Sequence, residues 1–137
     1  MKLSARNQFA GKVSKVTEGA VNGIVSIEVN GTPVSATISM EAISELGLAE
    51  GVEAVAVMKA TEVMIATADS KISARNKFAG KIAEINKGAV NAVVKVDSVI
   101  GTVSATISLN AVEELGLVEG GDVIAVVKAT SVMVGLA

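Results

Sequence analysis

Apolar and polar residues alternate along most of this chain, with the period of two that is typical of half-buried β-strands. Between residues 21 and 29, the apolar positions 21, 25, 27 and 29 share one face, while Asn22, Ser26 and Glu28 share the other. The alternation resumes at 34, 36 and 38 after Asn30-Gly31, a dipeptide that favours a hairpin turn. Further strands are expected over 9–16, 52–58 and 63–66.

A single helical stretch, residues 40–46, interrupts the strands between the third and the fourth. Met40, Ile43 and Leu46 would lie on one face of this helix, with Ser39 as its N-cap and Gly47 as its stop. Five strands with one helix in this position is the layout of an OB-type barrel.

The whole pattern then occurs a second time. Ser-Ala-Arg-Asn at residues 4–7 recurs at 73–76, a spacing of 69 residues (73 − 4), and the register holds without a gap to the end of the chain. We therefore predict an all-β fold of two tandem OB-like five-stranded barrels, each with one short helix, over residues 1–68 and 69–137. The joint at 67–71 is short and polar, so the two halves should lie close together. The second half lacks the Asn-Gly dipeptide and has Val99-Ile100-Gly101, so its turn should differ.

Composition limits how stable each half can be alone. Half of the residues are apolar, but the only aromatic residues are Phe9 and Phe78, which we assign to the core. Small domains bury too little surface to be robust without help. The absence of cysteine and histidine excludes disulfides and thiolate or imidazole metal sites, so association with other chains is the remaining route. We expect a homo-oligomer.

The chain shows no charged and apolar leader at its start and no apolar run of about 20 residues, so a cytoplasmic protein without a membrane partner is expected. Its formal net charge of −2 does not suit a general polyanion binder. Any anion site must therefore be local.

Catalysis is not expected. Histidine, cysteine and tyrosine are missing, and no nucleophile or phosphate-loop motif is present. Glu41 and Glu45 would share a helix face, but Asn110 replaces the first of them in the second half, which indicates a solvated surface. Binding of single-stranded nucleic acid, common for OB barrels, would require stacking platforms and a basic groove that two core phenylalanines and an acidic balance do not supply.

Three polar segments occur twice: Ser-Ala-Arg-Asn, Ala-Thr-Ile-Ser and Lys-Ala-Thr. Hydroxyls, backbone amides and one ammonium group per half are what a tetrahedral dianion requires when it leaves water. Serines at helix starts would add amides and the positive end of the helix dipole. The alternative is that these residues only cap turns and face solvent, and a duplication would preserve neutral residues too. A generic anion-binding module and a single-strand nucleic-acid binder remain alternative functions.

Taken together, these motifs resemble the molbindin family, whose unit is the Mop domain, and the resemblance covers both halves. It implies an OB-like barrel, tandem chains assembled into a trimer, and binding of molybdate or tungstate at subunit interfaces. Because no DNA-binding helix-turn-helix or transporter ATPase module accompanies the two copies, storage or homeostasis of the oxyanion is the role that the resemblance leaves. It implies no cofactor and no metal site other than the oxyanion itself.

The resemblance also assigns residues to the site. Lysine would supply charge, the serines would supply hydroxyl donors, and the arginine segments would supply mainly backbone amides. The predicted oxyanion-binding residues are Ser4, Ala5, Arg6, Ser39, Lys59 and Ala60, with Ser73, Ala74, Arg75, Ser108, Lys128 and Ala129 in the second half. A second type of site near a symmetry axis is expected at Asn22 and Asn91, for which a turn or strand-edge role is an equal alternative.

Overall fold

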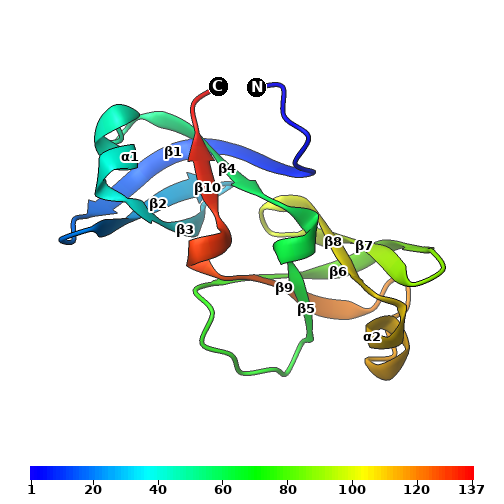
Figure 1. Ribbon diagram of the computed structural model, residues 1–137. Helices are drawn as coiled ribbons and strands as arrows, with labels where there is room; N and C mark the ends of the chain where they lie inside the picture. The colour runs from blue at the N-terminus through cyan, green and yellow to red at the C-terminus, as the bar shows by residue number, and fades with distance from the viewer.

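The computed structural model describes all residues, 1–137, and consists of two curled five-stranded antiparallel sheets with two short helices (Figure 1). The first half contains β1 (Asn7–Thr17), β2 (Asn22–Val29), β3 (Thr32–Ser39), α1 (Met40–Glu45), β4 (Glu53–Met58), the 3₁₀ turn η1 (Ala60–Glu62) and β5 (Met64–Thr67). The second half contains β6 (Asn76–Lys87), β7 (Asn91–Ser98), β8 (Gly101–Ser108), α2 (Leu109–Glu114), β9 (Asp122–Val127), η2 (Ala129–Ser131) and β10 (Met133–Gly135). The predicted all-β class and the helix position are confirmed.

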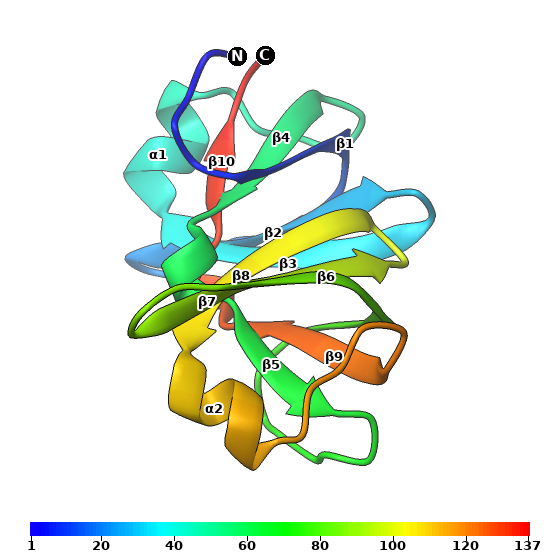
Figure 2. The same cartoon turned by 90° about the vertical axis from the view of Figure 1, so that its right-hand side faces the viewer.

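The two halves exchange their last strands. One sheet, the first barrel, has the order β10-β4-β1-β2-β3, and the other, the second barrel, has the order β5-β9-β6-β7-β8. The strand β5 leaves the first half and pairs with β9, while β10 returns to pair with β4 (Figure 2). The repeat in the sequence predicts that each of these strands pairs within its own half. Each five-stranded barrel is instead completed by the other half of the chain.

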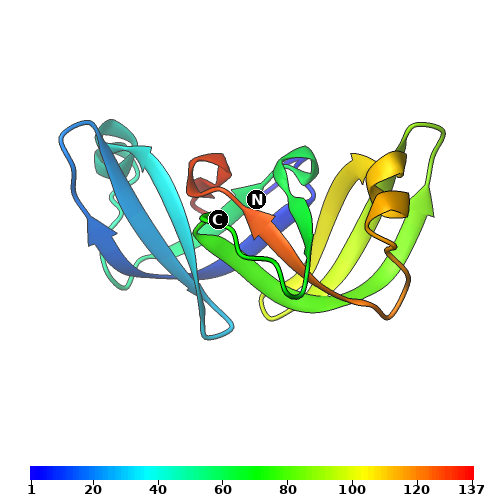
Figure 3. The ribbon, with the colours of Figure 1, turned by 90° about the horizontal axis from the view of Figure 1, so that it is seen from below.

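The exchange joins the halves into one packed body. A single cluster of 28 buried residues runs through both barrels, and Figure 3 shows the crossing strands between the two outer ends. Phe9 and Phe78 both belong to this cluster, as predicted. Part of the stability that a small barrel lacks is thus supplied within the chain, by the other barrel.

Each sheet curls until its edge strands approach each other, β10 toward β3 and β5 toward β8. A bulge at Ser14 in β1 shifts the register against β2, and Ala83 in β6 occupies the same place in the second barrel. Bulges increase local twist and bend a strand. Gly11 lies where β2 crosses so closely that a Cβ atom would collide with the Glu28 carbonyl. The long first strand of each half can therefore bend around the core.

The hairpin predicted at Asn30-Gly31 is present, and both residues have positive φ angles, 50° and 77°. The corresponding turn of the second half differs, as expected. There the hydroxyl of Ser98 donates to the Gly101 carbonyl at 2.7 Å, and Ile100 is buried.

One detail of the predicted pattern is wrong. The alternation predicts Val21 on the same face as positions 25, 27 and 29, but Val21 precedes β2 and is 74% exposed. It lies in the turn beyond the end of the ladder, where its carbonyl accepts a hydrogen bond from the Met40 amide. The alternation of β2 is otherwise as predicted. None of the helices has the length and apolar character needed to cross a membrane.

Candidate anion-binding site

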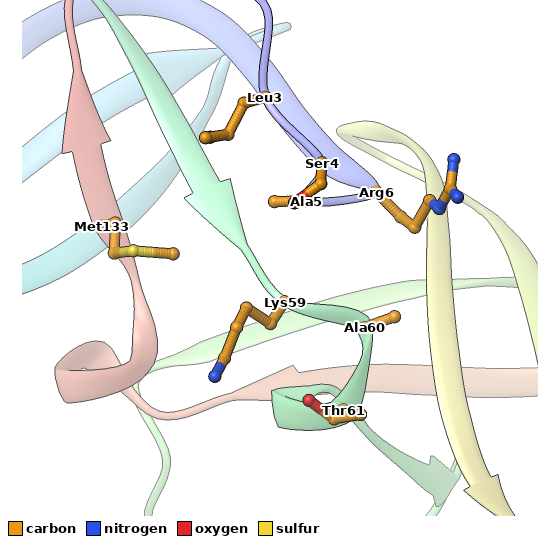
Figure 4. A pocket seen from close by; sticks show the side chains of 8 residues that line it. All are labelled: Leu3, Ser4, Ala5, Arg6, Lys59, Ala60, Thr61 and Met133. Atoms are coloured by element: carbon orange, nitrogen blue, oxygen red, sulfur yellow. The ribbon is translucent and has the colours of Figure 1, made fainter.

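Five of the six oxyanion-binding residues predicted in the first half line one hollow of about 340 Å³ (Figure 4). The segment before β1 contributes Ser4, Ala5 and Arg6, and the segment after β4 contributes Lys59 and Ala60. The remaining lining residues are Leu3, Thr61 and Met133. Met133 belongs to β10, so the strand exchange brings a residue of the second half to the site of the first.

The two segments meet because of the pairing of β1 with β4. Asn7, the first residue of β1, lies opposite Met58, the last residue of β4. The chain before Asn7 and the chain after Met58 therefore diverge from one point and leave a space between them. After Met58 the chain enters η1, in which the Glu62 amide donates to the Lys59 carbonyl at 2.9 Å. The first amides of such a turn have no partner within it.

The charges that line the hollow favour an anion. Lys59 and Arg6 are cationic, and no carboxylate lines the hollow. The two ion pairs of the chain, Lys81 with Asp122 and Lys95 with Glu84, do not involve Lys59. Figure 4 shows the Lys59 side chain extending from the end of β4 on the side away from Ser4 and Ala5, and the Arg6 guanidinium directed away from Lys59. Arg6 also lines a hollow of about 380 Å³ on the outer face of the second barrel.

The second half repeats the same local structure. Lys128 begins η2 with an extended backbone, φ −66° and ψ 140°, close to the −72° and 140° of Lys59. Asn76 lies opposite Val127, which precedes Lys128. No hollow gathers Ser73, Ala74, Arg75, Lys128 and Ala129, however. Of these residues, Ser73, Ala74 and Arg75 follow the joint between the halves, where Thr67 and Asp69 form a hydrogen bond of 2.8 Å.

Ser39 is not part of the hollow. It caps α1, with its hydroxyl oxygen accepting from the Ala42 amide at 3.0 Å, and it lies opposite Asn22 in the β2–β3 ladder. Ser108 and Asn91 repeat this arrangement. The capping role predicted for both serines is confirmed. Within one chain, Ser39 is grouped with the candidate for the second type of site and not with Lys59.

Sequence reasoning missed the role of the asparagine that ends each Ser-Ala-Arg-Asn segment. Asn7 and Asn76 are the only buried polar residues, each 1% exposed. Their side-chain amides bond to the backbone of the opposite barrel, as described below. The recurrence of Asn at the fourth position is the available signal, but the repeat alone does not separate it from the anion-binding segment.

Comparison with known proteins identifies the family. The model of the TOBE domain matches residues 3–65 and again residues 72–134. The chain belongs to the TOBE family. Its two TOBE domains correspond to the two sequence repeats, and the predicted membership of the Mop-type proteins is confirmed.

Relatives of this TOBE protein match either the pair of domains or one copy. The "Molybdenum transport protein ModE" of Herbaspirillum seropedicae is 36% identical over 99% of this chain and 52% of its own length. The "Molybdenum-pterin-binding protein MopA" of Rhodobacter capsulatus is 34% identical over 99% of the chain and 53% of its own. The chain thus spans about half the length of these relatives. A "Probable molybdenum-pterin-binding protein" of Haemophilus influenzae is 54% identical over 47% of the chain and 96% of its own length.

A solved structure matches the whole TOBE pair. The cytoplasmic molybdate-binding protein ModG, in a form with molybdate bound, superimposes with a TM-score of 0.95 at 41% sequence identity, and each chain is covered completely. The tandem arrangement of this chain is therefore shared with a protein that holds molybdate.

Proposed function

We propose that this protein binds molybdate, and its congener tungstate, and serves in the storage and homeostasis of the oxyanion. The observation that carries the proposal is the hollow in which one chain gathers Ser4, Arg6 and Lys59 without a carboxylate in its lining. The whole-chain similarity to ModG with molybdate bound supports the choice of ligand. Binding is reversible and leaves the anion chemically unchanged.

Each group has a distinct part in holding the dianion. Lys59 and Lys128 supply positive charge, since neither has an ion-pair partner in the chain. Ser4 and Ser73 donate hydroxyl hydrogen bonds. The Arg6 and Arg75 segments contribute backbone amides, which agrees with the direction of the Arg6 guanidinium away from Lys59 in Figure 4. Charge-assisted hydrogen bonds of this kind are the strong ones in proteins.

The sites are completed by association of chains into a homotrimer. Ser4, Lys59, Thr61 and Met133 are exposed, so a dianion in the hollow would remain open to water on one side. Ser39 and Ser108 lie elsewhere on the chain and reach such a site only from a second copy. Val21 and Val90, each 74% exposed beside Asn22 and Asn91, provide apolar surface for such an assembly. The second type of site, at Asn22 and Asn91, would lie in the same interface.

The names of the relatives describe transport and binding of molybdenum species. We infer that this chain also acts by binding, not by catalysis, and that it does so in the cytoplasm without a membrane or nucleic-acid partner. Both phenylalanines are buried, at 9% and 1% exposure, so neither offers a stacking platform to a base.

Equilibrium titration with molybdate, tungstate, sulfate and phosphate tests the proposal, with the oligomeric mass measured by light scattering in parallel. Because sulfate carries the same charge as molybdate, selectivity must come from the size of the closed site, and we expect similar affinity for molybdate and tungstate but much weaker binding of sulfate. Binding of sulfate with equal affinity would indicate a generic anion-binding module instead. Saturating molybdate should also raise the melting temperature, because a ligand held by the folded assembly stabilises it.

A further inference from the structure

We infer that Asn7 and Asn76 are positioning residues, each of which fixes the anion-binding segments of its own half against the opposite barrel. The inference rests on the proposed function, since it concerns the same hollow. It assigns a role to two residues that lie beside the hollow and do not line it.

The contacts of these asparagines cross between the barrels in a reciprocal way. The Asn7 Nδ2 donates to the Ser104 carbonyl at 2.9 Å, and the Ser104 amide donates to Asn7 Oδ1 at 2.8 Å. Asn76 makes the same pair with the Ser35 backbone, both at 2.8 Å. A side-chain amide offers one donor group and one acceptor, as a peptide group does. Each asparagine therefore acts as one extra rung on an edge strand of the opposite barrel.

These bonds are protected from water and complete. Both asparagines are 1% exposed, and the chain contains no buried side-chain polar atom without a partner. A hydrogen bond in such surroundings costs more to lose than an exposed one, because the orphaned group remains desolvated. We call the paired hydrogen bonds of Asn7 with Ser104, and of Asn76 with Ser35, the clasps. The clasps are thus rigid, in contrast to the exposed residues of the hollow.

The position of Asn7 in the chain links this rigidity to the hollow. Arg6 precedes it directly, and Met58, its partner in the β1–β4 ladder, directly precedes Lys59. The two chain segments that line the hollow therefore begin directly beside Asn7 and directly after its ladder partner, Met58. In addition, η1 packs against β8, the strand to which Asn7 is bonded. Asn76 stands in the same relation to Arg75, Val127 and Lys128.

A ligand group is held well only if its own support is rigid, and loss of such support in metal sites commonly costs about 10- to 100-fold in affinity. We expect an effect of this order at the anion hollow when Asn7 loses its two hydrogen bonds. The loss should fall on the half that the asparagine supports, whereas general destabilisation would weaken both halves.

The test uses the full chain with one lysine removed, so that one half at a time reports on binding. In the Lys128→Ala background, Asn7→Ala should weaken molybdate binding about 10- to 100-fold, and in the Lys59→Ala background the larger loss should follow from Asn76→Ala. Asn86→Ala, an exposed asparagine of β6, serves as the matched control. Asn7→Ser keeps one neutral polar group that can bond to the Ser104 backbone, and provides a second variant, with a smaller expected loss, should the alanine change prevent folding.

The outcomes separate the two proposals. Equal losses in both backgrounds, or a lower melting temperature with unchanged affinity, would show that the asparagines only hold the barrels together and would overturn the inference. If the unaltered protein binds neither molybdate nor tungstate, the proposed function itself fails and the positioning role falls with it. Losses confined to the half that each asparagine supports would establish the role.

Discussion

The two halves of the chain agree closely in some regions and differ in others, and the difference separates what the fold needs from what it tolerates. The asparagine clasps, the serine caps and the exchanged strands occur in both halves with nearly equal geometry. The hairpin turns, the ion pairs and the lining of the hollow do not. The asparagine and strand contacts that join the barrels, and the caps that begin the helices, have remained symmetric, while the hairpin turns and ion pairs at the surface have diverged.

The largest effect is expected where the exchanged strands enter the opposite barrel. Ile65 of β5 is 9% exposed, while the equivalent Val134 of β10 is smaller and only partly buried. Ile65→Ala should cost about 2–5 kcal/mol of unfolding free energy, as large-to-small core changes do. Val134→Ala should cost clearly less. Urea denaturation of the two variants measures both, and equal losses would show that the two exchanged strands contribute alike.

The lysines test whether the halves bind equally. Removing a charged hydrogen-bond donor typically costs about 1.5–3 kcal/mol. Lys59→Ala and Lys128→Ala should each weaken molybdate binding by about this amount at one class of site, and the Lys59 change should have the larger effect because only its half shows a formed hollow. Calorimetric titration resolves the classes. Lys15→Ala, an exposed lysine of β1 outside the hollow, is the control and should bind as the unaltered protein does.

Sequence reasoning recovered what alternation and repetition encode, and missed what depends on partners distant in the chain. The alternation of β2 and the cap at Ser39 are local, so both could be predicted. The exchange of β5 and β10 could not, because a short strand pairs equally well with β4 or with β9, and the choice depends on how the joint at 67–71 directs the chain. The clasps at Asn7 and Asn76 depend on that same choice.

The serine caps should respond equally in the two halves. Ser39 and Ser108 have the same backbone angles within a degree and the same hydrogen-bond length of 3.0 Å. Replacing either by alanine should lower stability by about 1 kcal/mol, whereas asparagine, an equally good cap, should not.

Ser39→Asp keeps the cap but adds a negative charge. If a second chain brings Ser39 to the anion, this variant should lose molybdate binding at unchanged melting temperature, and intact binding would exclude Ser39 from the site.

The smallest effect is expected from an ion pair that only one half forms. Lys81 and Asp122 lie opposite each other on β6 and β9, with 2.7 Å between Nζ and Oδ1, and their side chains are 67% and 69% exposed. In the first half, Lys12 faces Glu53 in the same register without an ion pair. Exposed pairs contribute about 0.2–1 kcal/mol and are screened by salt. A double-mutant cycle with alanine at 81 and 122 should give a coupling energy in this range that vanishes in 1 M salt, and the cycle at 12 and 53 should give less. A coupling energy well above about 1 kcal/mol at 81 and 122 would show that a surface ion pair formed in only one half stabilises the second barrel substantially. It would contradict the conclusion that the surface contacts have diverged because the fold does not need them.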